Sequence, residues 1–277
     1  MGYKILCDSC TDFTPEMQVK DCFVRIPLTI DAGGAEFVDD GAIDTRELLR
    51  AMKASAAGTK TACPSPEQYM RWFDGAEDIY IVTLSARLSG SHNAAEQAVK
   101  CYREEGGRHN VHVFNSRSAS AGQVQAALKI WELAEQGLSF ETVVEQAERY
   151  LDEMQTMFVL EDLDNLRKNG RLTKVQSLVT GSLRIKLLMG ATPEGEIMKL
   201  GQGFTMRQAL NKMMAHAAGM ASHAGRRLVI SHCSCRERAE EVRELARKHC
   251  RFGDILITAT GGISTVYAND GGIVIAF

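Results

Sequence analysis

The chain has 277 residues, of which 45% are hydrophobic and 24% charged, and its net charge at pH 7 is −3. This composition is typical of a globular protein with a full apolar core, and the length favours two domains over one. No basic stripe interleaved with aromatic residues is present, which argues against a nucleic-acid partner. Without a secretory leader, a lipidation signal or a membrane-spanning apolar run in the sequence, we expect a cytoplasmic protein.

The first half alternates apolar strands with helical segments. Short apolar runs at 3–7, 79–84 and 111–115 predict buried strands, and an extended run at 22–30 predicts a further one. Strands that alternate with helices in this way predict a mainly parallel, Rossmann-like sheet. Ligands bind beyond the carboxyl ends of such strands, so we expect the polar loops at Asp8, Thr61, Ser89 and Ser116 to gather at one edge.

The segment 78–98, DIYIVTLSARLSGSHNAAEQA, runs from a predicted strand through a Ser/Gly loop into a helix that begins near Asn93. Ser89 and Gly90 precede that helix, where a hydroxyl and unpaired backbone N–H groups would suit an anionic headgroup. The alternative is an ordinary strand-to-helix turn with a serine N-cap. In the preceding loop, Pro64 forces Cys63 into an extended conformation, which predicts irregular backbone at Thr61.

The second half predicts strands at 157–160, 228–230, 254–260 and 272–277, and a hairpin formed by 183–189 and 196–200. A short helix is expected to end at Asn169-Gly170, and a capping box at 234–237 is expected to open another helix. The helical segment 206–217 has a methionine-rich face. That face is either plain core or the wall of a lipid-accepting tunnel, since flexible thioethers adapt to variable chains.

Two further patterns leave other chemistry open. Asp8 follows an apolar strand, as the nucleophile of some phosphatases does, but Cys10 stands where that pattern needs a second aspartate. A hydrolase using Asp8 or Ser89 is therefore the alternative function, although no Gly-x-Ser-x-Gly elbow surrounds a serine. Cys7 and Cys10 form a C-x-x-C pair that would suit a redox or metal site. Free cysteines in a cytosolic chain are more often small buried apolar residues.

Several motifs in order resemble the DegV family. They are Asp8-Ser-Cys-Thr-Asp12, Thr61-x-x-Pro64-Ser65, Leu88-Ser89-Gly90, Ser116-Arg-Ser-Ala-Ser-x-Gly122, Leu163 to Arg171, Ser182-Leu-Arg-Ile-Lys186 and Ile273 to Phe277. The resemblance spans nearly the whole chain.

The resemblance implies a fatty-acid-binding subunit that is not itself catalytic and presents a carboxylate to a separate ATP-dependent kinase. It implies two α/β domains with a ligand tunnel at or near their interface: residues 1–155 carry the headgroup loops, and residues 156–277 form a mixed sheet with helices and house the acyl tail. Thr61 and Ser89 would hydrogen-bond the carboxylate. No metal or cofactor besides the bound fatty acid is implied, and loading would involve a transient contact with a membrane surface.

The sequence departs from the family pattern at three places. The third headgroup ligand is usually a histidine in a His-Thr-Gly-Pro-Gly-like loop, and here the loop reads Tyr267-Ala-Asn-Asp-Gly271. We therefore expect Tyr267 as the third ligand, donating a hydrogen bond without the positive charge of a protonated imidazole. Thr61-Ala-Cys-Pro64 replaces the family's Thr-Ser-Gln-Pro, and Ala86-Arg87 replaces its Ser-Gly, which adds a guanidinium near the mouth.

Overall fold

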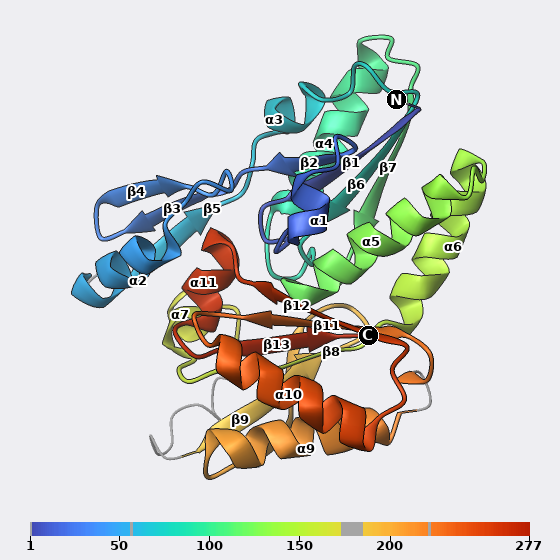
Figure 1. The fold of residues 1–277 in the computed structure, drawn as a ribbon. Helices are drawn as coiled ribbons and strands as arrows, with labels where there is room; N and C mark the ends of the chain where they lie inside the picture. The colour runs from blue at the N-terminus through green and yellow to red at the C-terminus, as the bar shows by residue number, and fades with distance from the viewer. Residues whose placement is uncertain (1, 56–57, 173–184, 221–222) are drawn as a thin grey trace.

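Residues 2–55, 58–172, 185–220 and 223–277 are described by a computed structural model of the chain (Figure 1). Their strands form a four-stranded, a three-stranded and a six-stranded sheet. The first half of the chain forms the two smaller sheets and the second half forms the largest one. The expected α/β architecture is confirmed.

The four-stranded sheet is parallel throughout, in the order β2-β1-β6-β7. Its strands are β1 (Tyr3–Asp8), β2 (Phe23–Ile26), β6 (Asp78–Thr83) and β7 (Asn110–Asn115). Its helices are α1 (Pro15–Gln18), α3 (Pro66–Met70), α4 (Ser91–Glu104), α5 (Ala121–Glu135) and α6 (Phe140–Glu153). Successive residues of β1 face opposite sides: Ile5 and Cys7 pack with α5 and α6, whereas Leu6 packs with α3 and α4. Both faces are covered, which explains why these strands are continuous apolar runs.

The three-stranded sheet is antiparallel and stands apart from the parallel one (Figure 1). It contains β3 (Thr29–Ala32), β4 (Ala35–Val38) and β5 (Thr59–Ala62), and α2 (Thr45–Ala54) belongs to the same unit. The prediction of one strand over 22–30 is wrong, because that run forms β2 and β3 in two different sheets. Pro27 has no N–H to continue the ladder of β2, and the N–H of Leu28 donates instead to the hydroxyl of Ser9 at 3.0 Å.

The six-stranded sheet has the order β10-β9-β8-β13-β11-β12 and is mixed, since only β11 and β12 pair in parallel. Its strands are β8 (Thr156–Val159), β9 (Lys186–Ala191), β10 (Ile197–Gly203), β11 (Arg227–His232), β12 (Asp254–Ala259) and β13 (Ile273–Ala276). Helices α9 (Met206–Ala218) and α10 (Arg236–His249) cover one face. The β9–β10 hairpin is as predicted from residue 186 onward. Residues 183 and 184 of the predicted strand, and residues 182–184 of the Ser182–Lys186 motif, lie outside the described residues.

Helix α5 joins the two large sheets. Its first half, residues 121–128, is buried on every side, and its polar residues Lys129, Glu132 and Glu135 lie in the less buried second half. One side packs on Ile5 and Tyr80 of the parallel sheet, and the same apolar cluster includes Val229 and Val274 of the mixed sheet. The seam between the halves is therefore a continuous core. Among the helices of the described ranges, none combines the length and the apolarity that crossing a membrane would take.

Two local predictions in the second half need correction. The capping box at 234–237 is absent, because α10 begins at Arg236 and its N-cap, Cys235, makes no side-chain bond to the helix. The connection at 261–271 contains a helix, α11 (Gly262–Ala268), which sequence propensity did not indicate. The short helix expected before Asn169-Gly170 is present as α7 (Asp164–Lys168).

Candidate functional site

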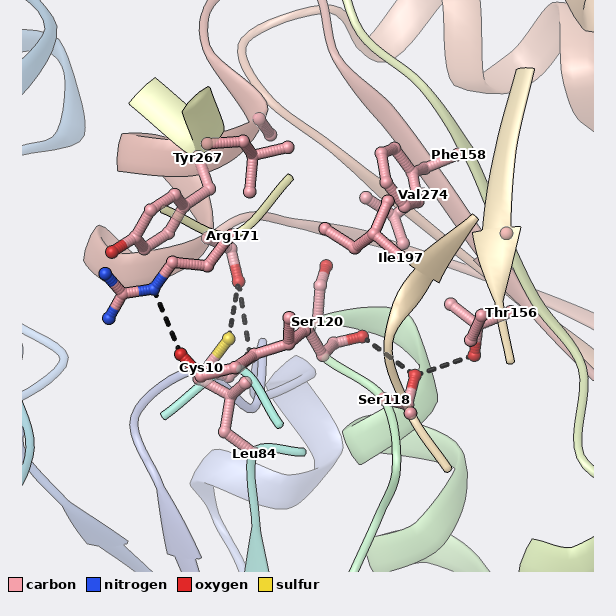
Figure 2. A pocket seen from close by; sticks show the side chains of 18 of the residues that line it. Cys10, Leu84, Ser118, Ser120, Thr156, Phe158, Arg171, Ile197, Tyr267 and Val274 are labelled. Carbon is pink, nitrogen blue, oxygen red and sulfur yellow. Dashed lines mark hydrogen bonds between the residues drawn. The ribbon is translucent and has the colours of Figure 1, made fainter. Parts of the chain in front are cut away.

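A cavity lies at the seam between the two halves of the molecule (Figure 2). It contains about 760 Å³ of empty space, open solvent at its mouth included, and the atoms that line it are almost all apolar. Leu84 and Leu88 line it from the first half, and Phe158, Ile197 and Val274 line it from the second. Such a cavity suits a hydrocarbon chain better than a polar ligand.

Polar side chains lie at opposite ends of this cavity. Figure 2 shows Tyr267 and Arg171 at one end and Ser118 and Thr156 at the other. The hydroxyls of Ser118 and Thr156 hydrogen-bond each other at 2.6 Å. The end near Tyr267 also carries the guanidinium of Arg171, which lines the cavity.

Thr61 and Tyr267, two of the three residues predicted to bind the headgroup, are in direct contact. The Oγ1 atom of Thr61 and the hydroxyl of Tyr267 are 2.8 Å apart, although the residues are 206 positions apart in the sequence. Thr61 lies in β5, so the prediction of irregular backbone there is wrong: it pairs with Ile30 of β3. Tyr267 projects from α11, and both side chains are half-buried.

Ser89, the third predicted ligand, lies in the loop that opens α4. Its Oγ accepts a hydrogen bond from the N–H of Ser91 at 3.2 Å, and the N-cap itself is Gly90, which has no capping side chain. The loop adjoins that of Thr61, because a Cβ on Gly90 would lie only 3.1 Å from the Sγ of Cys63. The start of α4 therefore lies beside the loop that follows Thr61. Leu88 lines the cavity, whereas neither Ser89 nor Thr61 is among the residues that line it.

Arg171 belongs to this site, although the sequence analysis assigned it no role. It lines the cavity, its guanidinium carbon lies 6.0 Å from the centre of the Tyr267 ring, and its Nε donates to the carbonyl of Leu88 at 3.1 Å. The one feature of the sequence that could have drawn attention to Arg171 is its position directly after Asn169-Gly170, where the preceding helix ends. Arg87, the guanidinium expected near the mouth, is exposed to solvent.

Two buried aspartates from the first half hold the N-terminus of α11. Asp39 accepts from the N–H groups of Gly262 and Ile263, both at 2.9 Å, and Asp12 accepts from that of Gly261 at 2.8 Å. Burial raises the pKa of both carboxyls, and these hydrogen bonds act in the opposite direction. Only glycine fits at 262, since a Cβ there would lie 2.8 Å from Asp39 Oδ1. The helix that carries Tyr267 is thus anchored to the first half of the chain.

Asp8 serves the fold, and its geometry does not favour the nucleophile proposed in the alternative function. Its carboxylate is fully buried and accepts from Leu84 N and Ser91 Oγ, both at 2.6 Å, and from Gln123 Nε2 at 2.8 Å. These bonds tie together the loops that follow β1 and β6 and the start of α5. The predicted gathering of polar loops at one sheet edge is confirmed for the loops of Asp8, Ser89 and Ser116, whereas Thr61 lies in β5 of the three-stranded sheet.

The cysteine pair and the methionine face are both core. Cys7 and Cys10 are buried, and burial raises the pKa of each thiol. In the described ranges, no three His, Cys, Asp or Glu side chains converge as a metal site would require. Met213 and Met214 are buried against the mixed sheet and do not line the cavity, so the tunnel-wall interpretation of that face is wrong.

Comparison with known proteins gives a consistent result. A family model described as an uncharacterised protein of the DegV family matches residues 3–277. A DegV domain-containing protein of Streptococcus pneumoniae is 36% identical, over 100% of this chain and 99% of that protein.

Three solved structures are similar over nearly their full length. A DegV family protein from Ruminococcus gnavus, refined with vaccenic acid, is 46% identical with a TM-score of 0.96, covering 100% of this chain and 99% of that one. The Fatty Acid Kinase (Fak) B3 protein of S. pneumoniae, loaded with linoleic acid, is 34% identical with a TM-score of 0.92 and the same coverage. A DegV family protein from Eubacterium eligens, loaded with heptadecanoic acid, is 26% identical with a TM-score of 0.91, covering 99% of this chain and 98% of that one.

Proposed function

The chain belongs to the DegV family, and on that basis we propose that it binds a long-chain fatty acid and presents the carboxylate to a separate kinase. It acts as a carrier and catalyses no step itself. One observation supports this most strongly: an almost wholly apolar cavity is lined at one end by Tyr267, whose hydroxyl contacts that of Thr61. The fatty acids in the three solved relatives are of the class that such a cavity would take.

The headgroup chemistry follows from the residues at that end. Thr61, Ser89 and Tyr267 would donate hydrogen bonds to the carboxylate oxygens. Uncharged donors orient the carboxylate without the strong charge pairing that would weaken its attack on a phosphate. Arg171 lies beside Tyr267 and provides a cation for the additional negative charge of an acyl phosphate.

The hydrocarbon tail supplies most of the affinity. Burial contributes roughly 0.8 kcal/mol per methylene, so a chain of about sixteen carbons offers on the order of 10 kcal/mol. We assign residues 1–155 to the domain that carries the headgroup loops and residues 156–277 to the domain that houses the tail. The seam would have to open during exchange, and a transient contact with a membrane surface would provide the fatty acid. No metal or other cofactor takes part in this proposal.

Reconstitution with a fatty acid kinase tests the proposed function. The protein is stripped of lipid, loaded with one defined fatty acid, and mixed with the kinase subunit and ATP, and hydroxylamine traps any acyl phosphate as a hydroxamate. We expect hydroxamate only when the loaded protein is present. Equal product from kinase and free fatty acid, or no product with a kinase that accepts another loaded carrier, would contradict the presentation role.

A further inference from the structure

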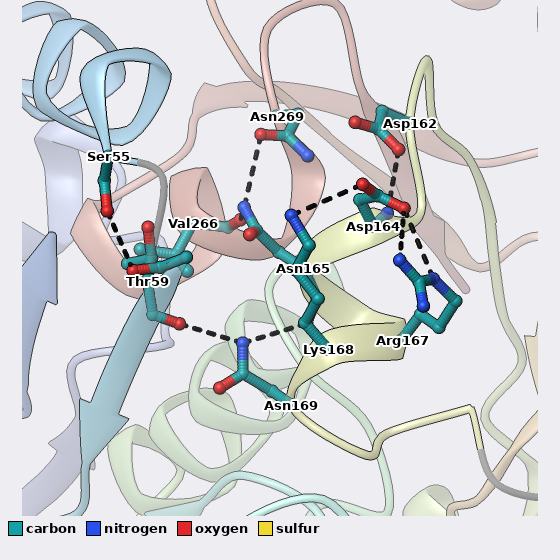
Figure 3. Close-up of polar contacts among 11 residues, drawn as sticks. Ser55, Thr59, Asp162, Asp164, Asn165, Arg167, Lys168, Asn169, Val266 and Asn269 are labelled. Carbon is teal, nitrogen blue, oxygen red and sulfur yellow. Dashed lines mark hydrogen bonds and ion pairs between the residues drawn. The ribbon is translucent and has the colours of Figure 1, made fainter. Parts of the chain in front are cut away.

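The segment from Asn165 to Arg171 contains most of α7 and the turn that follows it (Figure 3). Three of its side chains each donate a hydrogen bond to a backbone carbonyl outside the segment: one in α11, one in β5 and one in the loop before α4. Each of those carbonyls lies one or two residues before a proposed headgroup ligand.

Asn165 holds the helix of Tyr267. Its Nδ2 donates to the carbonyl of Val266 at 2.8 Å. Val266 lies in the last turn of α11, where carbonyls have no partner within the helix, and it immediately precedes Tyr267. Asn165 thereby fixes the C-terminal end of the helix whose N-terminal end is held by Asp12 and Asp39.

Asn169 holds the strand of Thr61. Its Nδ2 donates to the carbonyl of Thr59 at 2.9 Å and to that of Asn165, one helical turn earlier, also at 2.9 Å. β5 is an edge strand, and Thr59 lies two residues before Thr61 on it. The bond to the carbonyl of Asn165 links the two asparagines, so that the contacts to β5 and to α11 share one support.

Arg171 completes the set at the third loop. Its Nε donates to the carbonyl of Leu88, which immediately precedes Ser89, and its Nη1 donates to the carbonyl of Asn169. All three ligand-bearing elements are therefore fastened to one short segment of the second half of the chain.

We propose that Asn165 and Asn169 are positioning residues for the headgroup: they set the separation between Thr61 and Tyr267 by holding β5 and α11 against α7. This inference rests on the proposed function. Two hydroxyls that hydrogen-bond one carboxylate must each stay within about 0.5 Å of the position at which both bonds can form. The elements that carry them come from distant parts of the sequence, so their separation depends on a common support.

The test compares a sixteen-carbon fatty acid with its methyl ester. Asn165→Ala and Asn169→Ala should each weaken binding of the acid about tenfold, and should change binding of the ester less than twofold. The ester keeps the tail but has no carboxylate to orient. In a Tyr267→Phe background, Asn165→Ala should weaken acid binding less than twofold further, since its effect passes through the lost hydroxyl.

Asn211→Ala is the matched control. The Nδ2 of Asn211 donates to the carbonyl of Arg207 at 2.8 Å, the same bond to a carbonyl one turn earlier, on α9 and away from the cavity. It should leave the ratio of acid to ester affinity unchanged. If Asn165→Ala unfolds the protein, Asn165→Leu retains the volume of the side chain without its donor and serves in its place.

Two results would overturn the inference. Equal weakening of acid and ester by the asparagine variants would show a merely structural role, and so would a lower melting temperature with an unchanged affinity ratio. Wild-type protein that binds neither compound would instead overturn the proposed function, and the positioning role with it.

Discussion

Thr61→Val removes one hydroxyl from the proposed headgroup site and should leave the strand intact. Valine has nearly the shape of threonine and favours extended backbone, so the pairing of position 61 with Ile30 should persist. The change removes the proposed donor to the carboxylate. It also leaves the hydroxyl of Tyr267 without the partner that now lies 2.8 Å away.

The expected size of the effect follows from the kind of bond that is lost. A hydrogen bond to a charged group contributes about 1.5–3 kcal/mol, and each 1.4 kcal/mol changes an equilibrium constant tenfold. Affinity for a fatty acid should therefore fall by about 10- to 150-fold. Affinity for the methyl ester should change far less, because the tail contacts remain.

Displacement of a fluorescent fatty acid from lipid-free protein measures both affinities. Thr29→Val is the matched control, since Thr29 is an exposed residue of β3 in the same sheet, directly opposite Ala62. It should leave both affinities unchanged. A Thr61→Val protein that binds the acid within twofold of wild type would refute the assignment of Thr61 to the headgroup.

Three further changes test other parts of the account. Ser89→Ala should speed release of bound fatty acid about tenfold and leave the melting temperature of ligand-free protein nearly unchanged; an unchanged release rate would exclude Ser89 from the site. Tyr267→His should tighten fatty-acid binding as pH falls through about 6.5, where imidazole gains its proton, and a pH-independent affinity would place position 267 outside the site. Burial opposes ionisation of Glu161, but Lys186 and Arg238 outweigh it and lower its pKa. On acidification the carboxyl of Glu161 therefore gains its proton at a higher pH in the unfolded chain than in the folded one. Below about pH 4 the free energy of unfolding of wild-type protein should fall by up to about 1 kcal/mol more than that of Glu161→Gln. Parallel curves of unfolding free energy against pH for the two proteins, measured by chemical denaturation, would contradict this.

The sequence predicted those parts of the candidate site whose structure is determined by neighbouring residues in the chain. A β-branched apolar run followed by Ser89-Gly90 and an alanine-rich segment can form only a few structures, and it forms β6, a loop and α4. The parallel sheet followed from the same alternation. The order of the motifs identified Thr61 and Tyr267, but only the fold shows that their hydroxyls meet.

The parts that were missed depend on distant contacts. Gly262-Ile-Ser-Thr-Val266 contains poor helix formers, and α11 exists because Asp12 and Asp39, more than two hundred positions away, accept its first N–H groups. Thr61 lies in a strand only because β3 is there to pair with it. Arg171 gains its place from the carbonyl of Leu88, a contact that no periodicity in the sequence encodes.

Mass spectrometry of the purified protein, first native and then after solvent extraction, tests the central claim most directly. We expect a mass shift of one long-chain fatty acid per chain in the native spectrum and the same fatty acid in the extract. We also expect this shift to be lost more readily in Ser89→Ala protein. A chain that stays empty when offered fatty acid, or that retains a polar phosphorylated compound instead, would contradict the carrier function.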